Sequence, residues 1–75
     1  MSKWSEELQE TTRKQVFFGA VMKDEDHNYG IFARHDGKVL IMGIQDVGIL
    51  TLPTDEVLAT FDSVDEMVEA GWVMD

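Results

Sequence analysis

An Asp-Gly pair at positions 36 and 37 constrains this chain more than any other feature, because it lies between two strand-forming stretches. These stretches run from Tyr29 to His35 and from Lys38 to Ile44. Asp-Gly favours a two-residue turn, since both positions of that turn take a positive φ. The sequence therefore predicts a β-hairpin, and the short loop fixes its register, with His35 opposite Lys38.

This register gives the predicted hairpin two apolar faces. The first face carries Tyr29, Ile31, Ala33, Leu40, Met42 and Ile44, with the His35–Lys38 pair next to the turn. The second face is apolar with a charge at its end and carries Gly30, Phe32, Arg34, Val39, Ile41 and Gly43. A sheet of this kind needs cover on both sides. Either the two short helices and the loops supply it, or part of the apolar surface stays exposed and a second copy or a partner protein covers it.

The N-terminal part predicts a helix followed by a strand. Residues 3–14 have the pattern of an amphipathic helix, with Trp4 and Leu8 four positions apart. Residues 15–23 are aromatic and β-branched with apolar side chains on both faces, which predicts a central strand covered on both sides. The polar residues 24–28 predict a loop.

The middle of the chain predicts short elements separated by turns. Residues 45–48 favour a turn, and residues 49–52 favour a short strand that Pro53 ends or places at a sheet edge. Residues 54–56 indicate another turn or the start of a helix. Residues 57–61 favour a strand, with a short helix capped by Thr54 as the alternative.

The C-terminal part predicts a second helix and a final strand. Ser63 and Glu66 have the spacing of a capping box, and Gly71 suits the positive φ that ends a helix. Residues 72–74 predict a strand that joins the sheet. Together the elements predict one α+β domain over residues 1–75, an antiparallel sheet of four to five strands packed with an N-terminal and a C-terminal helix.

The residue types that catalysis or metal binding needs are few and scattered. The chain has no cysteine, and His27 and His35 lie at the two ends of one predicted strand, roughly 26 Å apart at ~3.3 Å per residue. Asp24 and Asp26 begin a loop that resembles an EF-hand, but Tyr29 stands where the sharp turn of that motif needs glycine. We therefore predict no enzyme activity, no catalytic or metal site and no cofactor.

Acidic residues outnumber basic ones, and the excess lies in the second half of the chain. Fifteen Asp and Glu against six Lys and Arg give a formal net charge of −9, and residues 39–75 contain no lysine or arginine. This charge has the wrong sign for direct binding to nucleic acid or to an anionic membrane. With no apolar run of ~18 residues and a polar N-terminus, we expect no membrane segment and a cytoplasmic location.

The acidic half predicts a binding inhibitor that presents carboxylates where a partner expects phosphates. Acids three or four positions apart on a helix stand ~5–6 Å apart, which is comparable to phosphate spacing along a nucleic-acid strand. Such a surface is attracted to the basic groove of a nuclease, a CRISPR effector or a transcription factor. The candidate partner-binding residues are Asp55, Glu56, Asp62, Asp65, Glu66 and Glu69.

In size, acidity, single-domain organisation and lack of cysteine, the chain is similar to phage-encoded anti-defence proteins such as anti-CRISPR and anti-restriction inhibitors. That resemblance implies a nucleic-acid mimic whose partner is a basic nucleic-acid-binding protein. The alternative is a homodimeric structural or regulatory interaction module, in which the acidity only serves solubility. Its candidate surface is the apolar sheet face with Phe32, Val39 and Ile41.

Overall fold

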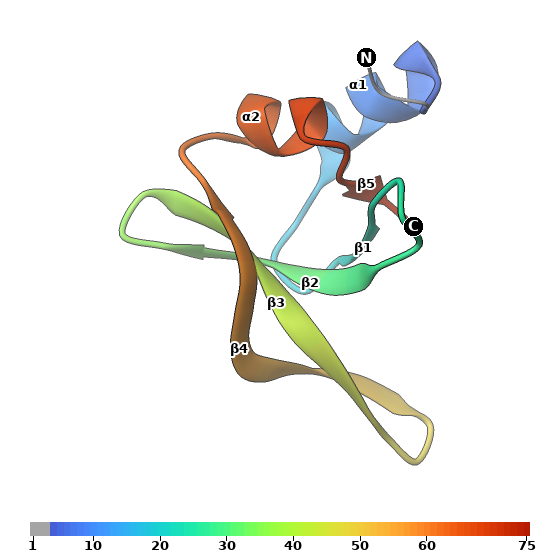
Figure 1. Ribbon diagram of the computed structural model, residues 1–75, viewed down its shortest axis with the longest axis vertical. Coiled ribbons are helices and arrows are strands. Elements are labelled where there is room, and N and C mark those ends of the chain that lie inside the picture. Colours follow the sequence, from blue (N-terminus) through green and yellow to red (C-terminus); the bar gives the residue numbers. More distant parts are fainter. Residues whose placement is uncertain (1–3) are drawn as a thin grey trace.

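The computed structural model describes residues 4–75 and confirms the α+β class, with a five-stranded antiparallel sheet and two helices (Figure 1). The strand order in the sheet is β4-β3-β2-β1-β5. In chain order the elements are α1 (Glu6–Gln15), β1 (Val21–Lys23), β2 (Tyr29–His35), β3 (Lys38–Val47), β4 (Leu50–Phe61), α2 (Val64–Glu69) and β5 (Val73–Met74).

Helix α1 begins at Glu6, because the hydroxyl of Ser5 caps it and accepts a hydrogen bond from the N–H of Leu8 at 3.1 Å. Acidic residues in its first turn and basic residues in its last turn complement the helix dipole. The predicted helix is confirmed from residue 6 and extends one residue further than expected, to Gln15. Residue 3, where the prediction began, lies outside the described residues.

The predicted strand over residues 15–23 is wrong except for its last three residues, which form β1. Helix α1 continues through the first residue of that stretch, and Gly19 then turns the chain at a φ of 94°. The N–H of Gly19 donates to the carbonyl oxygen of Phe32 at 2.9 Å, which holds the turn against β2. As a result, Phe17 and Phe18 are exposed on a turn and do not pack inside the sheet.

The hairpin at Asp36 and Gly37 is confirmed. Their φ values of 52° and 76° are both positive, as a type I′ turn requires. The pairing of β2 with β3 has the predicted register, with His35 opposite Lys38. This part of the fold was predictable because a two-residue loop leaves no freedom for the strands to slide.

Strands β3 and β4 form a second hairpin that is longer than predicted. The turn expected at residues 45–48 is wrong, because β3 continues to Val47 and the chain reverses at Gly48 and Ile49. Gly48 has a φ of 63°, which suits the first position of a type II′ hairpin turn. The distal part of this hairpin extends away from the helices (Figure 1).

Strand β4 runs through Pro53 without a break, so the turn or helix expected at residues 54–56 is also wrong. The strand over residues 57–61 is confirmed as the end of β4. Pro53 lies in an edge strand opposite Ile44, and its missing N–H is tolerated there because that position faces away from β3. Two register shifts against β3 follow, and Gly43 permits them: a Cβ there would lie 2.5 Å from Oγ1 of Thr54.

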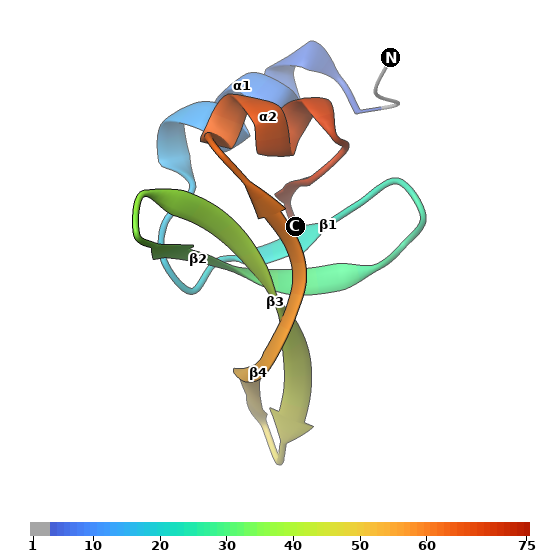
Figure 2. The ribbon, with the colours of Figure 1, turned by 60° about the vertical axis from the view of Figure 1, so that its left-hand side comes forward.

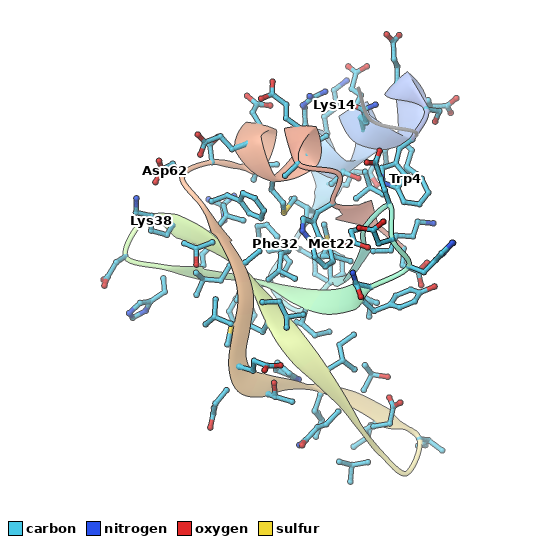
Figure 3. All side chains as sticks on the ribbon, in the orientation of Figure 1. Trp4, Lys14, Met22, Phe32, Lys38 and Asp62 are labelled. Carbon is cyan, nitrogen blue, oxygen red and sulfur yellow. The ribbon has the colours of Figure 1, made fainter. Side chains whose placement is uncertain are left out.

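Both helices lie on the same side of the sheet, so the fold has two layers (Figures 1 and 2). The core between the layers is apolar, with Phe32 and Met22 at its centre (Figure 3). Its buried members are Ala20, Met22, Phe32, Val39, Ile41, Met67, Val68 and Trp72. The hairpin face that carries Phe32, Val39 and Ile41 therefore packs against the helices.

Helix α2 ends as the sequence predicted. Gly71 has a φ of 107° and donates its N–H to the carbonyl oxygen of Val68, and the N–H of Trp72 donates to Met67. These two bonds form a Schellman motif. The chain then enters β5, which pairs with β1 and confirms the predicted final strand.

Thr12 joins the first helix to the last strand. Its side chain is fully buried, and its hydroxyl donates to the carbonyl oxygen of Leu8 at 2.9 Å. The same hydroxyl accepts a hydrogen bond from the N–H of Met74 at 3.1 Å. Nearby, Nε1 of Trp4 donates to the carbonyl oxygen of Gly71 at 2.7 Å. The two ends of the described chain are thus held together by polar contacts.

Replacing Thr12 with valine should lower the free energy of unfolding by about 1–3 kcal/mol, because the isosteric side chain leaves the N–H of Met74 without its acceptor. Chemical denaturation monitored by circular dichroism measures the loss. Thr12→Ser keeps the hydroxyl and should recover part of the stability. Thr11→Val is the matched control at the neighbouring position, and an equal loss there would contradict the assigned role.

Candidate functional site

The six acids predicted to bind a partner fall into two groups. Four of them gather around α2 and form what we call the α2 acidic surface: Asp62, Asp65, Glu66 and Glu69. All but Asp65 line an open hollow of about 470 Å³. The other two, Asp55 and Glu56, lie within β4. The structure therefore brings four of the six predicted residues together and separates the remaining pair.

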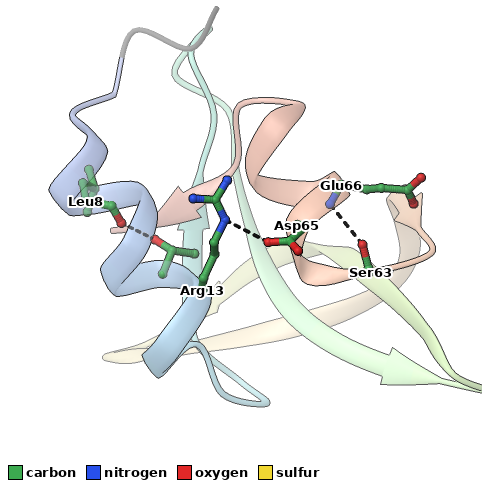
Figure 4. Close-up of polar contacts among 6 residues, drawn as sticks. Leu8, Arg13, Ser63, Asp65 and Glu66 are labelled. Carbon is green, nitrogen blue, oxygen red and sulfur yellow. Dashed lines mark hydrogen bonds and ion pairs between the residues drawn. The ribbon is translucent and has the colours of Figure 1, made fainter.

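Two basic side chains from the first half of the chain compensate part of the α2 acidic surface. Nε of Arg13 in α1 lies 2.9 Å from Oδ1 of Asp65 (Figure 4). Lys38 at the start of β3 pairs with Asp62 (Figure 3), and this carboxylate raises the pKa of Lys38. Since four carboxylates meet two cations, the surface keeps a net charge of −2.

Glu66 also has a structural role. Its N–H donates to the hydroxyl of Ser63 at 3.2 Å, which is the predicted capping bond (Figure 4). Its side-chain Oε2 accepts a hydrogen bond from the N–H of Asp62 at 2.7 Å. In the usual capping box this second bond comes from the cap residue itself. Here Glu66 instead restrains Asp62, the residue before the cap, and Asp62 belongs to the same acidic surface.

Three of the predicted acids have side chains that form neither an ion pair nor a hydrogen bond within residues 4–75: Asp55, Glu56 and Glu69. Glu69 belongs to the hollow beside α2. Asp55 instead lines a groove on the other face of the sheet. Glu69 is therefore the member of the α2 acidic surface whose side chain has neither an ion pair nor a hydrogen bond within the described residues.

The acids of α2 should be replaceable without unfolding the protein. The pair of Arg13 with Asp65 is exposed, so Asp65→Asn should change the free energy of unfolding by less than about 1 kcal/mol. Ser63→Ala removes the helix cap and should cost about 1 kcal/mol or more. Thermal and urea denaturation compare the two variants. A larger loss for Asp65→Asn than for Ser63→Ala would assign Asp65 a structural role.

Asp24, the first residue after β1, stabilises the loop that follows this strand. Oδ1 of Asp24 accepts hydrogen bonds from the N–H groups of Asp26 and Asn28, and Oδ2 accepts one from the side chain of Asn28. Burial works against the charged form of Asp24, but these hydrogen bonds outweigh it and lower the pKa of the carboxyl below its usual 3.8. The carboxylate is thus occupied within its own turn.

Because the folded pKa of Asp24 lies below the unfolded value, its contribution to stability is complete above that value and is lost as the pH falls through the folded pKa. Asp24→Asn should therefore have a lower urea midpoint than the unmodified protein at about pH 7, and the difference should shrink towards about pH 2.5. Asp26→Asn is the control in the same loop. A difference that is independent of pH would contradict the assignment.

Within residues 4–75, no three histidine or carboxylate side chains are grouped so that they could hold a metal ion. Neither described helix has the length and apolar character needed to cross a membrane.

The apolar surface predicted for dimerisation is not exposed. Phe32, Val39 and Ile41 are 1%, 1% and 0% exposed and belong to the core beneath the helices. These three side chains therefore cannot form the predicted dimer surface in this fold. Both faces of the hairpin could have received the helices, and the sequence pattern of the hairpin does not distinguish them.

The opposite face of the sheet, which we call the helix-free face, carries an apolar groove of about 350 Å³. Strands β2 and β3 form its floor, and Phe18 and β4 lie at its sides. Its apolar lining residues are Phe18, Ile31, Ala33, Leu40, Met42 and Pro53. Arg34, His35, Thr54 and Asp55 complete the lining. No helix of the described chain covers this face (Figure 2).

The distal part of the β3–β4 hairpin, residues 44–53, is a second apolar surface, which we call the hairpin arm. Its exposed apolar side chains are Val47, Ile49, Leu50 and Leu52. Ile49 at the tip is 100% exposed. The arm was not expected, because the predicted turn over residues 45–48 ended the strand before Val47. Glycine at the first position of a two-residue loop, followed by Ile49 and Leu50, was the available signal.

No protein-family model matches the chain, and comparisons with curated proteins and with solved structures give no match either.

Proposed function

We propose that this protein is a non-enzymatic inhibitor whose α2 acidic surface occupies the nucleic-acid-binding groove of a basic partner protein. The observation that carries the proposal is the grouping of Asp62, Glu66 and Glu69 around one open hollow. Carboxylates held on one helix and its preceding loop present negative charge at intervals that a phosphate-binding groove accepts. The activity is of the kind that anti-CRISPR and anti-restriction inhibitors from phage exert in the cytoplasm.

Electrostatic attraction supports this proposal at long range. A net charge of −9 on 75 residues attracts a basic groove before contact and repels nucleic acid. Binding of this kind weakens as salt screens the charges. The partner is therefore a protein that exposes clustered lysine and arginine, and not a nucleic acid.

The ion pairs of the structure rank the acids within the proposed interface. Within residues 4–75, Glu66 and Glu69 form no ion pair, so neither has to give up a cation when a partner binds. Asp62 and Asp65 already pair with Lys38 and Arg13, and a partner cation has to compete with these exposed contacts. We place the strongest contribution on Glu66 and Glu69 for this reason.

The proposal is tested with amide variants, because an amide oxygen still accepts the hydrogen bonds described above. The partner captured from the host lysate is first saturated with its own nucleic acid, and the unmodified protein should displace that nucleic acid. The double variant Glu66→Gln/Glu69→Gln should displace it at least about 10-fold less well. The control Asp26→Asn/Asp36→Asn carries the same net charge and should differ from the unmodified protein by less than about twofold.

A third variant, Asp55→Asn/Glu56→Gln, measures the two predicted acids that lie apart in β4. Its effect should be smaller than that of the α2 double variant. If all three double variants weaken displacement equally, net charge alone acts and no acidic site exists. If none of them weakens it, the carboxylates are not the binding surface.

A second candidate function, a homodimeric structural or regulatory interaction module, is favoured by a different observation. The helix-free face carries an apolar groove, and the hairpin arm exposes Val47, Ile49, Leu50 and Leu52. Soluble monomers seldom expose contiguous apolar patches larger than a few hundred Å², and larger ones mark interfaces.

A further inference from the structure

We infer that a pocket on the helix side of the sheet binds an arginine side chain of the basic partner protein. The pocket has a volume of about 470 Å³, and we call it the Trp72 pocket. Its lining residues are Asp24, Asn28, Tyr29, Leu58, Ala59 and Trp72. None of them belongs to the α2 acidic surface. The pocket adds a second contact to the proposed function, and it rests on that function for the identity of the partner.

Three segments that are distant in the sequence form the pocket. Asp24 lies two residues after Met22, a buried member of the core. Asn28 lies two residues before Gly30, which pairs with Met22. Because side chains alternate along a strand, both residues continue the rows of the sheet that face the helices. Trp72 comes from the segment between α2 and β5 and packs in the core on this same side.

A β-bulge in β4 supplies another wall. Residues 57 and 59 pair with consecutive residues of β3, so Leu58 between them has no partner there. A bulge of this kind redirects a side chain and is common next to functional sites. Cδ1 of Leu58 lies 3.5 Å from the place where a Cβ on Gly30 would stand, which is on the helix side. Leu58 therefore lies on the same side of the sheet as Ala59, and it stays 43% exposed.

The indole N–H of Trp72 is a donor without a hydrogen-bond partner within residues 4–75. Trp72 is only 7% exposed. Among the described residues that are not exposed, no side-chain nitrogen or oxygen is both inaccessible and unpaired. The N–H is therefore accessible, and the pocket that Trp72 lines gives access to it. In contrast, Nε1 of Trp4 already donates to the carbonyl oxygen of Gly71. An occupant of the pocket can supply the acceptor that Trp72 lacks.

The loop that lines the pocket offers negative charge and acceptors. Within residues 4–75, Asp24 forms no ion pair. Its three hydrogen bonds come from neutral N–H groups, so they leave its charge uncompensated, and its Oδ2 can accept a further donor. The side-chain oxygen of Asn28 accepts no hydrogen bond in the described chain. The bonds within the loop hold both acceptors in place before a ligand binds.

An arginine residue of a protein matches these groups. Its guanidinium is a permanent cation with five N–H donors, which can serve Asp24 and Asn28 together. Its apolar stem suits Leu58 and Ala59. The main-chain carbonyl beside it supplies an acceptor for the N–H of Trp72. A lysine ammonium has fewer donors and is more strongly hydrated, so we expect it to bind less well.

Other classes of occupant do not match the pocket. A phosphate or a carboxylate would be repelled by Asp24 and by the next two residues of the loop, Glu25 and Asp26. An apolar side chain would desolvate the carboxylate of Asp24 and the N–H of Trp72 without replacing their hydrogen bonds to water. Within the described residues, Asp24 belongs to no group of three side chains that could hold a metal ion.

An NMR titration of the full chain tests the pocket without the partner. The probe is N-acetyl-arginine N-methylamide, which carries the guanidinium and main-chain carbonyl groups. We expect the indole N–H resonance of Trp72 to shift and saturate with a dissociation constant of about 1–10 mM. The resonance of Trp4, whose N–H is already bonded, should stay in place. The neutral isostere N-acetyl-citrulline N-methylamide should bind at least about 10-fold more weakly.

Variants identify the contacts, with circular dichroism to verify folding. Asp24→Asn should weaken binding of the arginine probe at least about fivefold. Asp26→Asn makes the same charge change in the same loop but outside the pocket lining, so it should change binding by less than about twofold. Trp72→Phe keeps an aromatic ring in the core but removes the N–H, and it should weaken binding about threefold or more. Its missing resonance also assigns the two indole signals.

Three results overturn the pocket as an arginine site. They are the absence of a shift up to about 50 mM probe, equal binding of the arginine and citrulline probes, and equal weakening by Asp24→Asn and Asp26→Asn. The comparison of the two probes needs no variant, so it holds even where a substitution disturbs folding.

The partner's role is tested in the displacement experiment described above. Asp24→Asn should displace nucleic acid from the partner about three- to tenfold less well than the unmodified protein. Unchanged displacement by a variant that has lost probe binding would overturn the assignment of the partner's arginine to this pocket. Failure of the variants of the α2 acidic surface to weaken displacement would count against the proposed function and would leave the probe titration unaffected, so the two proposals fail separately.

Discussion

Two short helices can cover only one face of a five-stranded sheet, and the rest of this structure follows from that constraint. The helices bury Phe32, Val39 and Ile41, and the polar contacts of Thr12 and Trp4 hold the helices and β5 in place over them. On the opposite face Ile31 and Ala33 are buried, whereas Leu40 and Met42 are only partly covered by the described chain. In so small a protein, conformational entropy nearly offsets the burial of one core, so a second covered face matters for stability.

Folding also redistributes the charge that separates the two halves of the sequence. Arg13, Lys23 and Lys38 lie in the first half, and each pairs with an acid of the second half. The sequence suggested an acidic surface without cations, whereas the structure contains one that is half compensated. The consequence is a smaller set of free carboxylates, centred on Glu69, and a sharper hypothesis about which residues a basic partner would contact.

The parts of the fold that were predictable depend on local geometry. A two-residue turn fixes the register of β2 and β3, and Ser63 and Gly71 fix the ends of α2, because each signal acts within a few residues. The parts that were not predictable depend on distant contacts. Phe17 and Phe18 have strand-forming side chains but lie on a turn, since the end of α1 decides where the chain reverses. Pro53 remains in a strand because that strand is at the sheet edge.

The grouping of acids around α2 was predictable from helical spacing. Their ion pairs with Arg13 and Lys38 were not, because these cations come from distant parts of the sequence. The apolar groove lies on the helix-free face, away from α2. A homodimer formed through that face would therefore leave the α2 acidic surface of each copy free. Two copies would present it twice, which raises the apparent affinity for a partner with two basic grooves.

Binding to a basic partner and association of two copies also respond oppositely to salt. Screening weakens attraction to a basic groove but relieves repulsion between two chains of charge −9. An apolar contact between like-charged copies therefore strengthens under the conditions in which carboxylate mimicry fails.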